Sequence, residues 1–219
     1  MAPSILIADD HPLFRDALAG IAYSSIQGMN VLAVGDINAT IKALEENPET
    51  DLVLLDLKMP GAMGFSGLIF LRNQFPKIPI AIVSASETDA SIKRSISLGA
   101  SGFIPKSSSP DVMKAAICQI LEGNIWIPDE SVLDDSQSEN EFLEISSRIS
   151  SLTPQQMRVL MMLMEGLLNK QIANNLSITE ATVKAHVSAI LVKLEVYSRT
   201  KAVILASQIS ERGEEIRPI

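Results

Sequence analysis

Five short apolar runs constrain the fold of this 219-residue chain more than any other feature of its sequence. Within each run the residues do not alternate between apolar and polar. This is typical of parallel strands whose two faces are both covered by helices. Four of the runs end next to a carboxylate, a hydroxyl group or a lysine. The runs occupy residues 5–8, 31–34, 52–55, 80–83 and 102–104.

Segments with helical periodicity separate these runs. In the first of them, Leu13, Ala17, Leu18 and Ile21 recur at spacings of three and four residues. The last begins where Ser109 precedes a proline, which is a capping residue followed by proline in the first helical turn. Alternating strands and helices predict an α/β domain over residues 1–122, built on a doubly wound, five-stranded parallel sheet.

The composition changes after residue 122. Residues 123–151 carry seven acidic residues and one basic residue, and within them residues 129–151 are rich in Ser, Asp and Glu and contain few apolar residues. Such a composition favours an extended, solvated chain. We therefore expect an acidic linker over 123–150, with some helix around 141–149.

Residues 151–212 have helical periodicity throughout, and residues 213–219 form a short tail. We expect a small all-α domain of four helices. Residues 152–212 hold seven basic and four acidic residues, whereas the whole chain has a net charge of −8. A basic segment in an acidic protein suggests a polyanionic partner.

A single cysteine, Cys118, excludes an intramolecular disulfide and a zinc site with several cysteines. A reducing, cytoplasmic setting is therefore the expectation. The N-terminus lacks the basic and apolar regions of a secretory signal, and no apolar stretch is long enough to span a membrane.

Polar residues follow four of the predicted strands, at the edge where parallel sheets bind ligands. Three carboxylates brought together there would repel one another and bind a hard divalent cation such as Mg²⁺. A lysine and a serine at the same edge could contact a phosphoryl group, and a carboxylate can act as nucleophile to form an acyl phosphate. The residues in question are Asp9, Asp10, Asp56, Ser84 and Lys106.

This set resembles the receiver domain of bacterial two-component response regulators. The resemblance rests on Asp9-Asp10, on Asp56 followed by 59–61 (Met-Pro-Gly), on Ser84-Ala85 and on 102–106 (Gly-Phe-Ile-Pro-Lys). It implies a flavodoxin-like fold in which Asp56 accepts a phosphoryl group from a sensor histidine kinase. It further implies that Asp10, Asp56 and the backbone carbonyl of Lys58 hold Mg²⁺, with Asp9 acting largely through water. Ser84 and Phe103 would then form the switch pair.

Two short helices joined by a tight turn, 172–176 and 182–194, predict a helix-turn-helix. Apolar residues of the second helix fall on one side, and small residues fall on the other. Small outward side chains let a helix enter the major groove of DNA. The expected base or phosphate contacts are Lys170, Thr182, Lys184, Ala185, Ser188, Lys193, Arg199 and Lys201.

Residues 150–210 resemble the LuxR-type helix-turn-helix, in the segments 152–154, 169–173, 182–187 and 194–200. Joined to a receiver, this is the NarL/FixJ type of regulator. The resemblance implies an active homodimer that binds paired operator half-sites in double-stranded DNA. The sequence departs from the family pattern at two places. Gln155-Gln156 stand where Arg-Glu is frequent, and Ser188 stands where many members carry a basic residue.

Two alternatives stay open at this point. One is a phosphorylation-independent DNA-binding regulator whose receiver does not switch. The other is a phosphorelay or protein-interaction protein whose C-terminal helices bind protein. A phosphotransferase of the haloacid dehalogenase type is disfavoured, because it needs an aspartate where Lys58 stands. We expect no enzymatic activity beyond the chain's own phosphorylation and dephosphorylation.

Overall fold

A computed structural model describes residues 2–62, 64–128 and 137–209 of the chain. By their contacts, the residues group into two compact units, one of 1–62 with 75–135 and one of 63–74 with 136–219. None of the described helices is both long and apolar enough to cross a membrane.

The first unit contains a five-stranded parallel sheet with the strand order β2-β1-β3-β4-β5. This confirms the predicted doubly wound α/β architecture. The four apolar residues of β3 are all buried, as continuous apolar runs predict for covered parallel strands. The strands are β1 (Ser4–Ala8), β2 (Asn30–Val34), β3 (Leu52–Leu55), β4 (Ile80–Ser84) and β5 (Gly102–Pro105).

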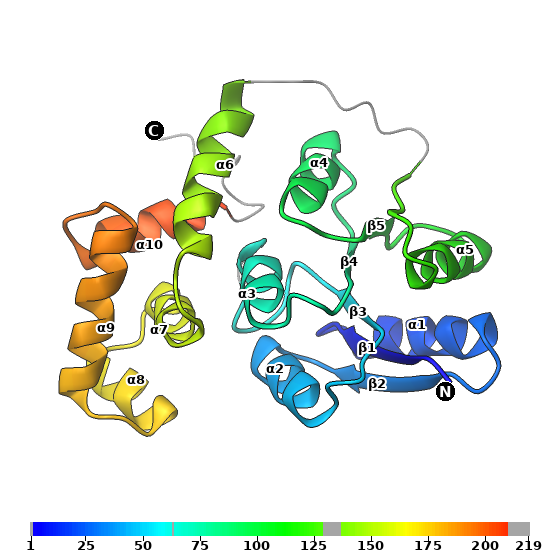
Figure 1. Cartoon of the computed structure of the whole chain (residues 1–219), viewed down its shortest axis with the longest axis horizontal. Coiled ribbons are helices and arrows are strands. Elements are labelled where there is room, and N and C mark those ends of the chain that lie inside the picture. Colours follow the sequence, from blue (N-terminus) through cyan, green and yellow to red (C-terminus); the bar gives the residue numbers. More distant parts are fainter. Residues whose placement is uncertain (1, 63, 129–136, 210–219) are drawn as a thin grey trace. The chain divides into compact units, whose positions relative to one another are not determined.

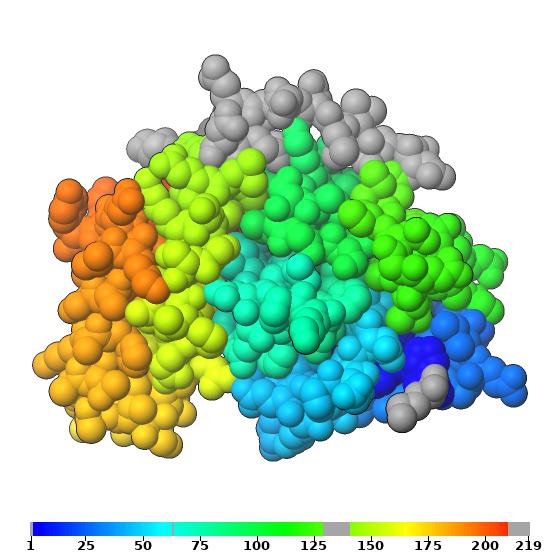
Figure 2. Space-filling model, in the orientation of Figure 1, coloured from blue at the N-terminus to red at the C-terminus, as the bar shows by residue number. Residues whose placement is uncertain are grey.

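Alternate residues of the strands point to opposite faces of the sheet, and one face packs under α1 (Pro12–Ser25) and α5 (Pro110–Leu121). These two helices lie side by side in Figure 1, and Figure 2 shows them as adjoining blue and green parts of one surface. Their buried residues belong to one core cluster with the strands: Ile5, Ile7, Leu18, Ala22, Leu52, Leu54, Ala81, Val83, Ile104, Met113, Ala116, Ile117 and Ile120.

Side-chain caps mark where three helices of the first unit begin. The Asp36 carboxylate accepts a hydrogen bond from the backbone of α2 (Ile37–Glu46), and Thr88 does the same for α4 (Asp89–Ser97). Ser109 caps α5 ahead of its first-turn proline, as predicted. Each cap satisfies a backbone N–H group that the helix itself leaves unbonded.

A short bridge extends the sheet beyond β5. Trp126 pairs in parallel with Gly102, its carbonyl accepts a hydrogen bond from the Phe103 amide at 2.9 Å, and its amide donates to Ser101 at 3.2 Å. The indole is partly buried and packs against the core cluster, so Trp126 is a packing anchor after α5. The absence of a side chain at Gly102 allows this close approach, since a Cβ there would lie 2.9 Å from the Trp126 carbonyl oxygen.

In the second unit, the described residues form helices and connecting turns, with no strand. Its helices are α3 (Ser66–Gln74), α6 (Gln137–Ser150), α7 (Pro154–Met164), α8 (Asn169–Leu176), α9 (Glu180–Lys193) and α10 (Arg199–Ser207). Thr153 and Gln156 form a reciprocal capping box at the start of α7, with hydrogen bonds of 3.3 and 3.0 Å. A glutamine therefore provides the support that a glutamate gives in the usual capping box.

Helix α6 is longer than the helical segment that the sequence predicts within the acidic linker. Phe142, Ile145 and Ile149 recur at spacings of three and four residues, and all three are buried. This narrow apolar stripe packs against α3 and α10 and outweighs the acidic composition of the segment. The tail after residue 209 lies outside the described residues.

The bridge at Gly102 yields a test of packing. In the Gly102→Ala variant the added methyl group would lie 2.7 Å from Ile120 Cδ1 and 2.9 Å from the Trp126 carbonyl oxygen. We expect the free energy of unfolding, measured by urea denaturation, to fall by about 1–3 kcal/mol.

The control for this test is Gly20→Ala in α1, where a Cβ would meet nothing within 4 Å. Because alanine favours the helix interior, this variant should be more stable by about 0.5–1 kcal/mol. Equal unfolding midpoints for the two variants would contradict the packing argument.

Candidate functional site

The carboxyl edge of the sheet brings together side chains that are far apart in the sequence. Asp9 and Asp10 follow β1, and Asp56 follows β3, the strand that pairs with β1. Potential ligand atoms of these three carboxylates and of His11 all lie within 4.8 Å of one another. Asp9 and Asp56 are almost fully buried, whereas Asp10 is partly exposed.

Lys106, directly after β5, supplies the positive charge at this edge. Its Nζ atom lies 2.7 Å from Asp9 Oδ2 and 2.7 Å from Asp56 Oδ2. The ammonium group also lies 4.8 Å from the centre of the Phe14 ring, in a cation–π contact. One lysine is thus held between two buried carboxylates and an aromatic face.

Burial and charge act in opposite directions on these groups. Burial raises the pKa of the Asp56 carboxyl above its usual value, although hydrogen bonds from Lys106 and from the Lys58 amide act against this rise. For Lys106, burial acts to lower the pKa, but the hydrogen bonds and charges of Asp56 and Asp9 together raise it. The ionised form of Asp56 therefore depends on nearby positive charge.

The cluster has the donor set of a divalent cation site. The buried oxygens Asp9 Oδ2 and Asp10 Oδ1 face Lys106 Nζ and His11 Nδ1, each at 2.7 Å. Carboxylate oxygens gathered in this way are suitable ligands for a hard cation.

The other residues predicted for this site lie in the same part of the sheet. Ser84 ends β4 and is buried, and its hydroxyl oxygen accepts a hydrogen bond from the Ser86 amide at 3.1 Å. Phe103 in β5 is fully buried. The Lys58 amide donates to Asp56 Oδ1 at 3.2 Å, which fixes the loop after β3 to the carboxylate.

Three residues of the first turn of α1 contribute to the site and were missed as site residues. His11 is the N-cap residue of α1, and its Nδ1 atom lies within the carboxylate cluster. Phe14 faces Lys106, and Arg15 donates to the Asp9 carbonyl at 2.8 Å. Their spacing of three and four residues places them on one helix face, which is the signal that could have identified them.

In the second unit, α8 and α9 form the predicted helix-turn-helix. Ser177 adopts a left-handed conformation at the end of α8, and the Thr179 hydroxyl caps α9 by accepting from the Thr182 amide. Val183 and Ile190 anchor α9 in the core. Several residues predicted to contact DNA are exposed: Lys170, Thr182, Lys184, Ala185, Ser188 and Lys201.

Lys193 and Arg199 differ from this exposed group, because each is bonded within the unit. Lys193 Nζ donates to the Ser151 carbonyl at 2.7 Å. The Arg199 guanidinium donates to the Leu167 carbonyl and to Asn169 Oδ1, which ties the start of α10 to the start of α8. Both side chains thus stabilise the arrangement of helices.

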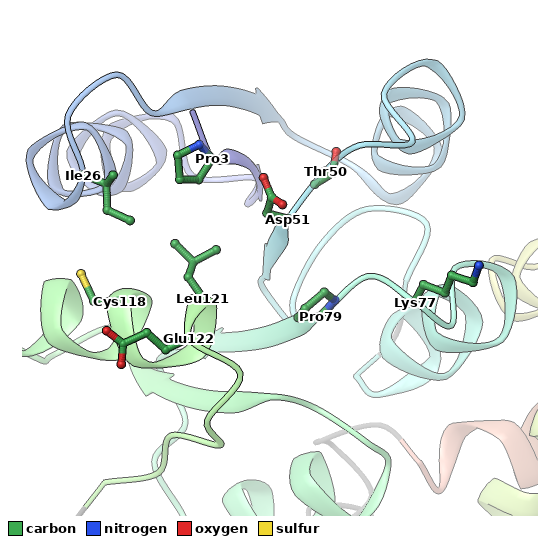
Figure 3. Close-up of a pocket in the computed structure, with 9 residues that line it drawn as sticks. All are labelled: Pro3, Ile26, Thr50, Asp51, Lys77, Pro79, Cys118, Leu121 and Glu122. Atoms are coloured by element: carbon green, nitrogen blue, oxygen red, sulfur yellow. The ribbon is translucent and has the colours of Figure 1, made fainter. Parts of the chain in front are cut away.

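A hollow of about 640 Å³ lies in the first unit, away from the carboxylate cluster. Figure 3 shows that Pro3, Asp51 and Pro79, which precede strands, and Cys118 and Glu122, near the end of α5, surround it. Its lining therefore belongs to the amino ends of the strands, opposite the edge that carries the acids. It contains none of the residues predicted for phosphoryl chemistry.

Comparison with known proteins identifies two families in this chain. The family described as response regulator receiver domain matches residues 5–118, and the bacterial regulatory proteins of the luxR family match residues 150–206. The glycerol metabolism activator of Pseudomonas putida is 42% identical over 210 residues, which cover 94% of this chain and 95% of the relative. The nitrate/nitrite response regulator NarL of Escherichia coli K12 is 31% identical over 94% of this chain and 95% of its own length.

Solved structures agree with these matches. A LuxR family DNA-binding response regulator from Silicibacter pomeroyi is 32% identical, with a TM-score of 0.52, over 58% of this chain and 98% of that protein. RcsB from Salmonella typhimurium is 22% identical with a TM-score of 0.55, over 94% of this chain and 98% of its own, and shows the likeness of fold.

The pairing of Lys106 with Asp56 can be tested by stability measurements in a metal-chelating buffer. The Lys106→Met variant leaves buried carboxylates without their cation and should lower the free energy of unfolding by about 3 kcal/mol near neutral pH. Without Lys106 the pKa of Asp56 rises further, so acidification protonates the carboxyl and relieves the repulsion. The loss should therefore be smaller at about pH 5.5 than at about pH 7.5.

The double variant Lys106→Met/Asp56→Asn is the second arm of this test. It should be more stable than the sum of the two single effects predicts, because the repelling charge is removed together with its partner. Additive effects, or a loss that does not change with pH, would show that the two side chains are not coupled.

Proposed function

This chain belongs to the two-component response regulators that join a receiver domain to a LuxR-type DNA-binding domain, and from this we propose that phosphorylation of Asp56 controls its sequence-specific binding to DNA. The convergence of Asp9, Asp10, Asp56 and Lys106 at one sheet edge carries the proposal. Transcription would be regulated through operators that the second domain recognises.

The acidic cluster fits Mg²⁺, with Asp10, Asp56 and the Lys58 backbone carbonyl as ligands and Asp9 acting mainly through water. When bound, the cation would neutralise charge on the phosphoryl group and on the carboxylates. Support for this assignment comes from the ligand atoms of the three carboxylates, which lie within 4.8 Å of one another.

In the phosphoryl transfer that we propose, an Asp56 carboxylate oxygen attacks the phosphorus atom of a phosphohistidine on the sensor kinase. A phosphorus–oxygen bond forms, the phosphorus–nitrogen bond breaks, and the kinase imidazole leaves with the electron pair. Lys106, which already contacts Asp56 Oδ2, would bind a phosphoryl oxygen, and the Ser84 hydroxyl would donate to another. Phe103 would repack with Ser84 and report the modification.

For DNA binding, we propose that α9 enters the major groove with its exposed face. Lys184, Ala185 and Ser188 would contact bases or nearby phosphates, and Thr182, Lys170 and Lys201 would contact phosphates. Lys193 and Arg199 already donate hydrogen bonds to backbone carbonyl groups. To bind phosphate as well, each side chain would have to bond a phosphate oxygen and its carbonyl group at the same time.

The proposed domain arrangement is a receiver over 1–122, an acidic linker over 123–150, a DNA-binding domain over 151–212 and a tail over 213–219. The proposed partners are a sensor histidine kinase and double-stranded DNA with paired half-sites, bound by a homodimer in the cytoplasm. Phosphorylation would shift a two-state receiver and thereby change how the DNA-binding domains pair.

Phosphorylation at Asp56 can be tested directly. Purified protein incubated with phosphoramidate and Mg²⁺ should gain one phosphoryl group by intact mass, and Asp56→Asn should gain none. Asp51→Asn is the matched control, because Asp51 precedes the same strand that Asp56 follows and is exposed at its far end. A phosphoryl gain that survives Asp56→Asn would overturn the assignment.

The role of α9 can be tested with a DNA fragment selected by the wild-type protein. Lys184→Ala should weaken binding by about 1–3 kcal/mol in fluorescence anisotropy, since an exposed lysine on the groove-facing side is lost. Lys42→Ala removes another exposed lysine, from α2, and should leave the affinity unchanged. Equal affinities for the two variants would exclude α9 as the reading element.

A further inference from the structure

We propose that Arg148 of α6 and Glu195, just past the end of α9, form an ion pair that positions α9 for DNA binding, so that α6 acts as part of the DNA-reading unit. The inference rests on the proposed function, because it takes α9 as the helix that enters the major groove. It goes further in assigning two positioning residues outside α9 itself and a role for the last helix of the acidic segment.

The backbone at the end of α9 provides the first observation. Glu195 has a left-handed conformation, with φ of 57°. Its amide donates to the Val192 carbonyl at 3.1 Å. The Val196 amide donates to the Leu191 carbonyl at 3.0 Å, which completes a Schellman motif. Glycine is the usual residue at this position, because a Cβ makes the left-handed conformation unfavourable.

Three other helices of the chain end with the expected glycine. Gly99, Gly123 and Gly166 follow the C-caps of α4, α5 and α7, with φ of 86°, 91° and 83° and the same pair of backbone hydrogen bonds. Glycine thus stands where the end of a helix only has to turn the chain. A glutamate at the same position of α9 indicates that its side chain has a use.

The structure shows what the Glu195 side chain contacts. Glu195 Oε2 lies 3.2 Å from a guanidinium nitrogen of Arg148, whose side chain is 27% exposed. The same nitrogen lies 2.7 Å from Glu144 Oε1, one turn earlier in α6. The bond to Glu144 holds the guanidinium against its own helix, and the bond to Glu195 ties it to the end of α9.

A second polar contact joins the same two parts of the unit. Lys193, the last residue of α9, donates from Nζ to the carbonyl of Ser151, which directly follows α6, at 2.7 Å. The apolar stripe of α6 packs against α3 and α10, whereas the ion pair and the lysine bond join the last turn of α6 to α9. The position of α6 and the position of the C-terminal end of α9 are therefore linked.

An ion pair of this kind changes DNA affinity without touching DNA. Apparent affinity falls in proportion to the fraction of molecules whose reading helix is in the binding position. The pair can change the equilibrium between positions by no more than its own contribution, and a partly exposed ion pair contributes about a 1.5- to fivefold factor. We expect effects of this size on the dissociation constant for DNA.

The test measures binding of the full chain to a DNA fragment selected by the wild-type protein, by fluorescence anisotropy. Glu195→Gln should weaken binding by about two- to fivefold, because the ion pair is lost. The matched control is Glu144→Gln, which removes the same charge from a glutamate on the same guanidinium, 65% exposed against 67% for Glu195. This control should not weaken binding. The sign is informative, because removing an acidic charge reduces repulsion from DNA and by itself strengthens binding.

Arg148→Gln provides the other half of a double-mutant cycle. It should weaken binding to the same extent as Glu195→Gln, and the double variant should bind no more weakly than either single variant, because both changes remove one interaction. Salt dependence separates positioning from contact with DNA. Loss of a phosphate contact would reduce the slope of log affinity against log salt by about 1, whereas loss of a positioning residue leaves the slope unchanged.

Glu195→Gly distinguishes positioning from support of the fold. Glycine adopts the left-handed conformation without steric cost, so the midpoint of thermal unfolding should be no lower than that of the wild type. DNA binding should nevertheless weaken as it does in Glu195→Gln. A lower midpoint together with weaker binding would show that the side chain supports the fold, and would overturn the positioning role.

The remaining outcomes separate this inference from the proposed function. Unchanged or stronger binding by Glu195→Gln, additive losses in the double variant, or a reduced salt slope in Arg148→Gln overturns the positioning role and leaves DNA binding by α9 standing. If the wild-type chain selects no DNA sequence, both proposals fail.

Discussion

A single ammonium group faces three carboxylates at the carboxyl edge of the sheet, and the chemistry of the first unit depends on this imbalance. Lys106 reaches Asp9 and Asp56 at equal distances, but it cannot neutralise the whole cluster. Burial strengthens every charge interaction in this place, because little solvent screens it. A cation bound at this cluster would therefore relieve the repulsion between the carboxylates, and under the proposed function it would also favour an anionic phosphoryl group there.

In the second unit, one helix both packs into the core and presents the exposed face proposed to bind DNA. Helix α9 must bury Val183 and Ile190 to hold the unit together while presenting a smooth, exposed face. Two of the basic side chains of residues 152–212, Lys193 and Arg199, stabilise the fold by bonding to backbone carbonyl groups. Selectivity for a DNA sequence would then depend less on basic side chains than on close contact of small side chains with base edges.

Much of this could be predicted from the sequence, because parallel strands and amphipathic helices have distinct periodicities. The five strands, the edge that gathers Asp9, Asp10, Asp56 and Lys106, and the helix-turn-helix follow from these periodicities and from motif spacing. Family resemblance added the roles of the individual residues, which geometry alone does not assign.

Other features could not be predicted, because they depend on which side chains meet after folding. The stripe of α6 was hidden by its acidic composition, and the contact of Phe14 with Lys106 requires the packing of α1 against the sheet edge. Likewise, the lysine and arginine that bond carbonyl groups look like surface cations in the sequence. Only the path of the neighbouring backbone shows that they have partners.

The bridge between β5 and Trp126 has a mechanical consequence for a regulator of this kind. The amide of Phe103 bonds directly to the carbonyl of Trp126, two residues before the described part of the first unit ends. The polypeptide that leads away from the first unit is therefore bonded to the backbone at β5, the edge strand of the sheet. A displacement of that strand would be transmitted to the departing chain through the two backbone hydrogen bonds of Trp126.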